Sequence, residues 1–130
     1  GPFDLDWMGT HASAMKNVDG KRIDFYSRGF DPYSVGINVL ANAVAHRNGH
    51  RINGYCYPPF NMLNTIIGYV FKERADVTIV HPCIEEPRLP WAQYLRGYPQ
   101  VKLPKRSAQK RTNQGWEGME ISLEYTVVSF

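Results

Sequence analysis

The residues best placed to do chemistry in this sequence form a corner of two prolines between two aromatic residues. Tyr57-Pro58-Pro59-Phe60 ends a predicted strand and precedes a predicted helix. Consecutive prolines hold the backbone rigid and leave carbonyl oxygens that accept hydrogen bonds from an amine. An aromatic ring beside them can stack on a nucleic-acid base. The plainer interpretation of the same residues is a stiff strand-to-helix turn.

A basic stretch downstream forms a second group of candidate residues. Lys102, Lys105, Arg106, Lys110 and Arg111 fall within ten residues that contain no acid. Local positive charge of this kind suits contacts with phosphates, so these residues are predicted to bind nucleic acid. The alternative is a solvated loop whose charge keeps the protein soluble. The formal net charge is only +3, which excludes a histone-like polycation.

Cysteine and histidine offer weaker candidates. Cys56, His81 and Cys83 follow neighbouring predicted strands and could meet, but their spacing is not that of zinc ligands. We therefore expect structural thiols and no metal or disulfide framework. His46 and His50 are separated by an Asn-Gly turn signal and are predicted to be a surface pair.

Carboxylates raise the alternative of a nuclease that holds two metal ions. Such a site needs acids on central strands beside a glutamate on a helix. Glu73 and Asp76 are the only acids on or near a predicted helix, and both stand at its far end. The nuclease interpretation is therefore disfavoured, although the sequence offers four aspartates for it: Asp4, Asp6, Asp24 and Asp31.

Hydrophobic periodicity predicts the elements that position these residues. The expected strands are 3–8, 21–27, 51–57, 77–80, 100–103 and 119–128, and the expected helices are 34–45, 62–74 and 91–95. Strand, helix and strand within 51–80 predict a βαβ unit with parallel strands. The two last strands predict an antiparallel hairpin around the basic stretch, with the final strand closing the sheet.

Length and composition predict one globular domain. The chain has 130 residues, of which 43% are apolar and 21% charged, as in ordinary globular proteins. Gly1-Pro2 is interpreted as the scar of a cleaved expression tag, which leaves 3–130 as a single domain of a longer protein. No apolar run is long enough to span a bilayer and no signal peptide is visible. We expect a nuclear or cytoplasmic protein without membrane contact.

Several blocks, taken in order, resemble one family. They are Asp6-Trp7-Met8-Gly9-Thr10, Tyr26 to Pro32, Gly36 to Leu40, Pro58-Pro59-Phe60, Val77 to Pro82, and Pro90-Trp91 with Leu95. Their order and spacing over about 3–104 resemble the adenine-methyltransferase-like segment of DIRS-type (tyrosine-recombinase) retrotransposon polyproteins, which is itself similar to phage Dam-type enzymes. The resemblance implies an α/β fold, a Rossmann-like methyltransferase-type three-layer sandwich. S-adenosylmethionine would lie near Asp6 and Gly9, at the carboxyl ends of the parallel strands.

The departures from the family's pattern fall where chemistry would occur. The motif of that family begins with Asn or Asp, whereas this chain has Tyr57, whose phenol cannot copy the compact acceptor that an amide or a carboxylate offers to an amine. Only Gly9 represents the small residues of the cofactor loop, and Trp7 and Met8 are bulky there. Asn38 stands where the retroelement pattern has Asp. These changes predict a pseudoenzyme that binds no cofactor.

Three functions follow as expectations. The first is a non-catalytic methyltransferase-like module of a retroelement-derived protein, which binds nucleic acid or a protein partner. The second is an active S-adenosylmethionine-dependent DNA adenine methyltransferase. The third is a homodimerisation or scaffold domain in which the final strand pairs with its copy across a two-fold axis.

Overall fold

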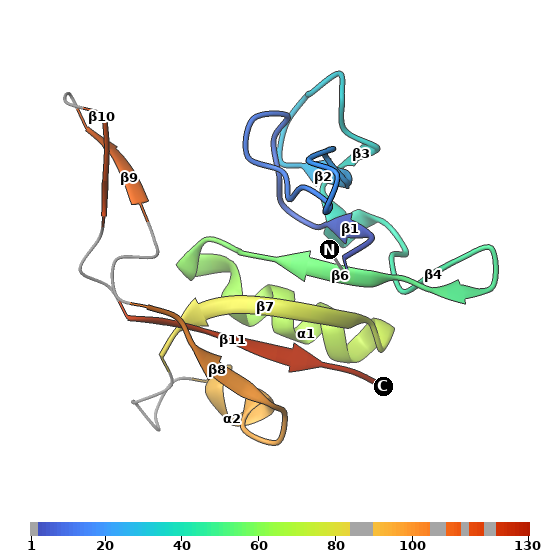
Figure 1. Ribbon diagram of the computed structural model, residues 1–130. Coiled ribbons are helices and arrows are strands. Elements are labelled where there is room, and N and C mark those ends of the chain that lie inside the picture. The colour runs from blue at the N-terminus through green and yellow to red at the C-terminus, as the bar shows by residue number, and fades with distance from the viewer. Residues whose placement is uncertain (1–2, 84–89, 105–108, 113–114, 119–121) are drawn as a thin grey trace.

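A seven-stranded sheet organises the chain (Figure 1). The computed structural model describes residues 3–83, 90–104, 109–112, 115–118 and 122–130. In sheet order the strands are β3 (Gly36–Ile37), β2 (Asp24–Ser27), β1 (Leu5–Asp6), β6 (Asn53–Cys56), β7 (Asp76–Pro82), β11 (Leu123–Val128) and β8 (Gln100–Lys102). The strands from β3 to β7 run parallel, while β11 is antiparallel to both of its neighbours. The α/β class, the mostly parallel sheet and the C-terminal antiparallel hairpin are confirmed.

The βαβ unit predicted over 51–80 is present. Strand β6 leads through a 3-10 turn, η2 (Phe60–Met62), into helix α1 (Leu63–Glu73), and β7 returns parallel to β6. The predicted apolar stripe of α1 was Leu63, Ile66, Ile67, Val70 and Phe71. The helix buries the first four of these and also Tyr69, whereas Phe71 is partly buried. The helix ends where Arg74 adopts a left-handed conformation with φ 52°.

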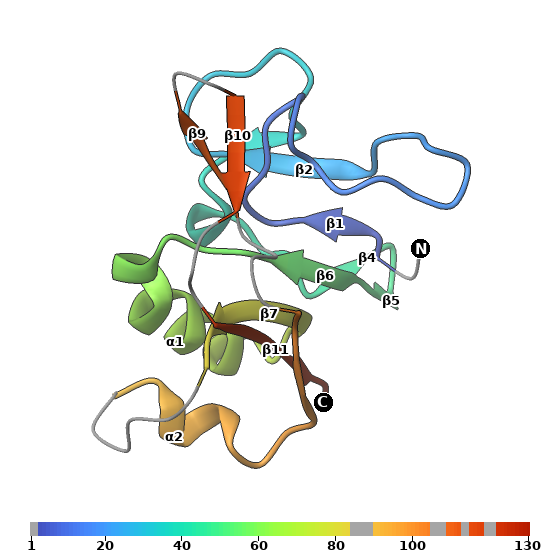
Figure 2. The ribbon, with the colours of Figure 1, turned by 60° about the vertical axis from the view of Figure 1, so that its left-hand side comes forward.

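The two helices lie on the same face of the sheet. Helix α2 (Ala92–Leu95) packs beside α1, and Figures 1 and 2 agree on this placement. The main core fills the space between them and the sheet, and it includes Ile66, Ile79 and Leu95. No helix covers the other face among the described residues. The expected three-layer sandwich is therefore a two-layer arrangement in the part of the chain that the structure describes.

The helix expected over 34–45 is absent. Strand β3 and one 3-10 turn, η1 (Val39–Ala41), occupy this range instead. The backbone leaves the helical path at Asn38, which takes a left-handed φ of 61° and whose side chain accepts a hydrogen bond from the Leu40 N–H. Asparagine side chains compete with the helical backbone in this way. Of the apolar residues behind the prediction, Val39 and Val44 are buried in the core, Leu40 is partly buried and Val35 is 48% exposed.

Two small hairpins stand outside the main sheet. The first joins β4 (His46–Arg47) to β5 (His50–Arg51) through Asn48-Gly49, whose φ angles of 52° and 79° suit a tight turn. The second pairs β9 (Gln109–Thr112) with β10 (Gly115–Gly118). Part of the basic stretch predicted as a loop is therefore a strand.

The final strand does not lie at an edge of the sheet. Strand β11 pairs with β7 over 123–128 and with β8 over 124–126, so β8 is the edge strand. The prediction that the final strand pairs with a second copy is wrong, because both of its hydrogen-bonding sides are occupied. None of the helices in the described ranges is long and apolar enough to cross a membrane.

Candidate functional site

The diproline corner stands at the carboxyl end of an inner parallel strand. Strand β6 lies between β1 and β7, and the chain turns at Pro58 and Pro59 before η2 begins. Tyr57 is 44% exposed and Phe60 is 61% exposed, so both rings are open to solvent at this tip. The corner thus presents two aromatic rings on a rigid backbone, at the edge where open α/β sheets bind ligands.

Asp6 lies at the equivalent end of β1, but its carboxylate holds its own loop. The side chain is buried, Oδ1 accepts from the Met8 N–H at 3.1 Å, and Oδ2 accepts from the Met15 N–H at 3.0 Å. Burial raises the pKa of Asp6, and the two backbone donors offset part of that effect. Both oxygens are therefore committed within the chain, and a ligand would have to displace one of these bonds.

Gly9 also serves its own loop. Its N–H donates to the Tyr26 carbonyl at 2.9 Å, which ties the loop to the end of β2. A Cβ at this position would lie 3.2 Å from the Ala14 Cβ and 3.3 Å from Asp6 Oδ2. The absence of a side chain therefore permits close packing inside the loop rather than the approach of a cofactor.

Trp7 fills the space behind the corner. It is only 1% exposed, and its ring meets the Tyr69 ring of α1 edge to face at 5.5 Å between centroids. It lies so close to β6 that a Cβ on Gly54 would stand 2.4 Å from the indole Nε1. Within the described residues Nε1 has no hydrogen-bond partner. The bulky residue that the sequence places in the cofactor loop is thus a plug built into the core.

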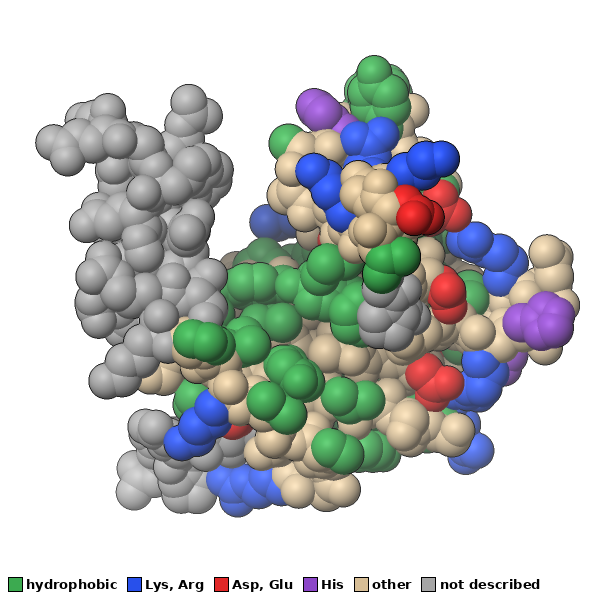
Figure 3. All heavy atoms as spheres, viewed as in Figure 1, with side chains coloured by type: hydrophobic (Ala, Val, Ile, Leu, Met, Phe, Trp, Pro, Cys, Tyr) green, Lys and Arg blue, Asp and Glu red, His purple; other side chains and the backbone are tan. Residues whose placement is uncertain are grey.

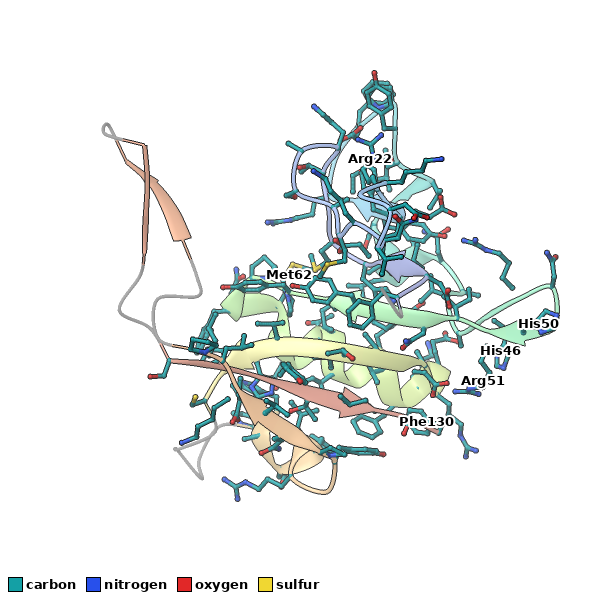
Figure 4. The ribbon with its side chains drawn as sticks, in the orientation of Figure 1. Arg22, His46, His50, Arg51, Met62 and Phe130 are labelled. Atoms are coloured by element: carbon teal, nitrogen blue, oxygen red, sulfur yellow. The ribbon has the colours of Figure 1, made fainter. Side chains whose placement is uncertain are left out.

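A small pocket is left beside this plug. Its volume is about 230 Å³, below the roughly 300–1,000 Å³ of typical small-molecule sites. It lies at the carboxyl end of the sheet, where the strand order reverses between β1 and β6. Met62, one of its lining residues, is labelled at this end of the sheet in Figure 4. The lining residues are Trp7, Met8, Ser27, Arg28, Asn38, Val39, Leu40 and Met62.

No protein-family model, curated protein or solved structure matches this chain. The family resemblance therefore stays a prediction drawn from the order of the sequence blocks.

Sequence reasoning missed part of the pocket lining. Strand β2 ends at Ser27 and Arg28 follows it, about 20 residues after Asp6, where dinucleotide-binding folds carry an acid for the ribose. Here Ser27 Oγ donates to the Gly29 carbonyl at 2.7 Å, and no carboxylate is among the described residues that line the pocket. The 20-residue interval was a usable signal. By contrast, the contribution of Met62 depends on the tertiary path of η2.

The basic stretch predicted to bind nucleic acid contributes no described residue to the pocket beside Trp7. Lys102 is exposed on the edge strand β8. Lys105 and Arg106 fall outside the described residues. Lys110 and Arg111 belong to β9, where their backbones pair with Glu117 and Trp116 of β10. The structure therefore brings neither Lys102 nor the β9 residues into the pocket beside Trp7.

The thiols and histidines do not assemble a metal site. Cys56 is buried, and burial raises its pKa well above the usual value, which keeps the thiol protonated. His81 is also buried: Nδ1–H donates to the Pro82 carbonyl at 2.8 Å, and Nε2 accepts from the Thr126 hydroxyl at 2.7 Å. No cluster of three metal-ligating side chains occurs in the described part of the chain.

The four aspartates are dispersed. Asp4 accepts from the Asn53 N–H, Asp24 pairs with Arg47, and Asp31 accepts from the His11 N–H at 3.0 Å. Hydrogen bonds, foremost from the Tyr33 N–H, lower the pKa of Asp31. Each carboxylate thus has a local structural partner. Figure 4 places His46, His50 and Arg51 at the end of the sheet opposite Met62.

Proposed function

We propose that this chain is a non-catalytic methyltransferase-like module that binds a macromolecule without modifying it. The observation that carries the proposal is the plug at the carboxyl end of β1, where Trp7 is packed between Gly54 and Tyr69. The remaining pocket of about 230 Å³ lacks a carboxylate for a ribose among its lining residues. The pocket therefore offers S-adenosylmethionine, a nucleoside with an amino-acid tail, neither enough volume nor a carboxylate to hold its ribose.

Strand order supports the family part of the proposal. Numbered along the chain within the main sheet, the order is 3-2-1-4-5-7-6, with only the seventh strand reversed. The first five positions repeat the order of doubly wound nucleotide-binding sheets. A reversed strand inserted before the last position suits a methyltransferase-type sheet.

The diproline corner supports the loss of chemistry. An amine that attacks a methyl group needs an acceptor for its proton, and an amide or carboxylate oxygen provides one. Tyr57 instead ends in a hydroxyl, and partial burial raises its pKa, so the group stays protonated. Its exposed ring, together with that of Phe60, suits stacking on a base better than it suits activation of an amine.

Calorimetry with S-adenosylmethionine tests the proposal. We expect no binding heat with the 130-residue chain, because Trp7 and its neighbours occupy the site. Binding that is lost in Asp6→Asn or Arg28→Ala would instead support the active methyltransferase, and methyl transfer to an adenine-containing DNA would establish it. The matched control is Asp19→Asn, which changes an exposed carboxylate in a distant turn.

The nucleic-acid version of the binding role has its own test. Lys102, Lys105, Arg106, Lys110 and Arg111 would contact phosphates while Tyr57 and Phe60 stack on bases. Arg106→Glu/Lys110→Glu should abolish binding of a labelled single-stranded oligonucleotide at low salt. Lys21→Glu/Lys72→Glu changes the charge equally at two exposed residues elsewhere and should retain most of the binding. Equal affinity in both double variants would contradict this version.

A further inference from the structure

The sheet face opposite α1 carries an apolar hollow that no described residue fills. We call it the open-face groove, and its volume is about 600 Å³. Figure 3 shows hydrophobic side chains gathered over β7 and β11 on this face. The groove is lined by Phe3, Asn53, Tyr55, Thr78, Val80, Leu103, Tyr125 and Val127.

Strand register explains why these side chains share a face. Tyr55 pairs with Thr78, Thr78 with Val127, and Val80 with Tyr125. Paired residues point to the same side of a sheet, and successive residues alternate. Their neighbours along the strands, such as Cys56 and Ile79, enter the core beneath α1 instead. The groove is thus the second face of the same strands that carry the main core.

Only one half of this second face has a cover in the described chain. The loop that follows β1 lies over β1 and β2, because Asp6 holds the Met15 N–H and the Arg22 guanidinium lies 5.6 Å from the centre of the Phe25 ring. The other half, over β6, β7 and β11, shows the groove. Of the groove's residues, Thr78 and Val80 are buried and Val127 is 37% exposed. Parallel sheets in proteins are almost always covered on both faces, so a half that no described helix or loop covers indicates a site for an additional layer.

The lining of the groove selects an uncharged occupant. Among the described residues that line it, none is an acid, a lysine, an arginine or a histidine. Burial raises the pKa of Tyr55 to about 12, so this phenol carries no charge at neutral pH. A phosphate backbone would find no counter-charge here and would lose its hydration. Nucleic acid is therefore the wrong chemistry for the open-face groove.

The shape of the groove selects a convex occupant. Two identical hollows placed face to face would leave a void between them, which is costly because protein interfaces are packed as densely as interiors. An α-helix presents about three to four large apolar side chains over two turns, which is the scale of a hollow of this volume. We propose that the open-face groove binds an amphipathic helix of a protein partner.

This inference deepens the proposed binding role, and that part of it rests on the proposed function. The surface is nevertheless different, because the groove shares no lining residue with the pocket beside Trp7. Cofactor binding would overturn the non-catalytic proposal without affecting the helix. Loss of helix binding would leave the calorimetric result unchanged.

Peptide selection on the 130-residue chain tests the inference. The probe is a displayed library of random peptides about 14 residues long, or roughly four helical turns. We expect the enriched peptides to carry apolar residues at i, i+3, i+4 and i+7 and to gain helicity on binding. Fluorescence anisotropy then gives their affinity. Val127→Glu, at a groove residue that is 37% exposed, should weaken binding at least about tenfold.

The controls separate the groove from the rest of the surface. Val18→Glu makes the same change at a valine that is 88% exposed, and it should leave peptide affinity unchanged. Urea unfolding of each variant verifies that it folds, and Val127→Thr provides a milder groove variant if the glutamate fails that check. Equal peptide affinity of Val127→Glu and the unsubstituted chain would overturn the inference. So would a homodimer that Val127→Glu dissociates, or displacement of the peptide by an oligonucleotide.

Discussion

The two faces of the sheet are built from the same strands but bury their side chains to different extents. Beneath α1 and α2, β6 and β7 contribute Cys56 and Ile79 to a continuous core, and both are fully buried. On the opposite face the described residues form a small buried cluster of Val80 and Leu123, with half-buried aromatic and leucine side chains around them. Strand β7 nevertheless buries every residue from Val77 to His81, on both of its faces, as in a sheet that is covered twice. The burial of β7 on both faces therefore fits a sheet with a second covering layer, which the described helices do not provide.

Creating a cavity on the covered face should cost more stability than any other change considered below. Ile66→Ala removes a fully buried side chain of α1 and should lower the free energy of unfolding by about 2–5 kcal/mol. Val127→Ala in the open-face groove removes a side chain that is partly in water and should cost less than about 1 kcal/mol. Urea denaturation measures both. Similar losses for the two variants would show that the groove is covered in solution.

Adding a side chain beside Trp7 on the covered face should have an intermediate effect on stability. Gly54→Ala brings a methyl group to 2.4 Å from Trp7 Nε1, so it should cost about 1–3 kcal/mol of stability through overpacking. Gly97→Ala meets nothing within 4 Å and should change stability by less than about 0.5 kcal/mol. Adding Trp7→Phe to Gly54→Ala should recover part of the loss, because the smaller ring makes room. A neutral Gly54→Ala would mean that the indole is loosely held.

The smallest expected effect is a pH dependence of stability that comes from His81 on the covered face. Burial lowers the pKa of His81, and Glu124, whose Oε1 lies 3.8 Å from Nδ1, only partly opposes this shift. The unfolded chain, with a histidine pKa near 6.5, therefore gains a proton before the folded chain does. Stability should fall as the pH drops through about 6.5, and the contribution of His81 to this slope should fade within about one pH unit above that value.

Urea unfolding between about pH 5.5 and 7.5 measures this pH dependence. His81→Gln should flatten it, since glutamine does not titrate, whereas the exposed His50→Gln should leave it unchanged. An unchanged slope in His81→Gln would contradict the assignment. The open-face groove contributes nothing in this range, because tyrosine is its only titratable side chain.

Local patterns predicted some elements well and others poorly, for physical reasons. The stripe in 62–74 predicted α1 to within a residue at each end, because spacing and burial agree there. The stripe in 34–45 predicted burial of Val39 and Val44 correctly but a helix wrongly, since the asparagine at 38 diverts the backbone. Strand boundaries at the first elements were also too long, as β1 is only Leu5–Asp6.

The candidate site divides in the same way. The position of Tyr57 to Phe60 at a strand tip follows from local turn chemistry, so the sequence alone was enough. The packing of Trp7 against Gly54 and Tyr69 joins three segments that are distant in the sequence, so no local sequence pattern predicts it. The inner place of β11 likewise depends on long-range pairing.

That inner place has a consequence for how the chain folds during synthesis. Until residues 123–128 have left the ribosome, the outer side of β7 stays unpaired and β8 has no neighbour to bond with. The residues that pair between β7 and β11 are more than 40 positions apart in the sequence, from Pro82 with Leu123 to Val77 with Val128. Contacts so distant in sequence form slowly. The nascent protein thus passes through a stage with a bare strand edge, which is the stage at which a chaperone would protect it from aggregation.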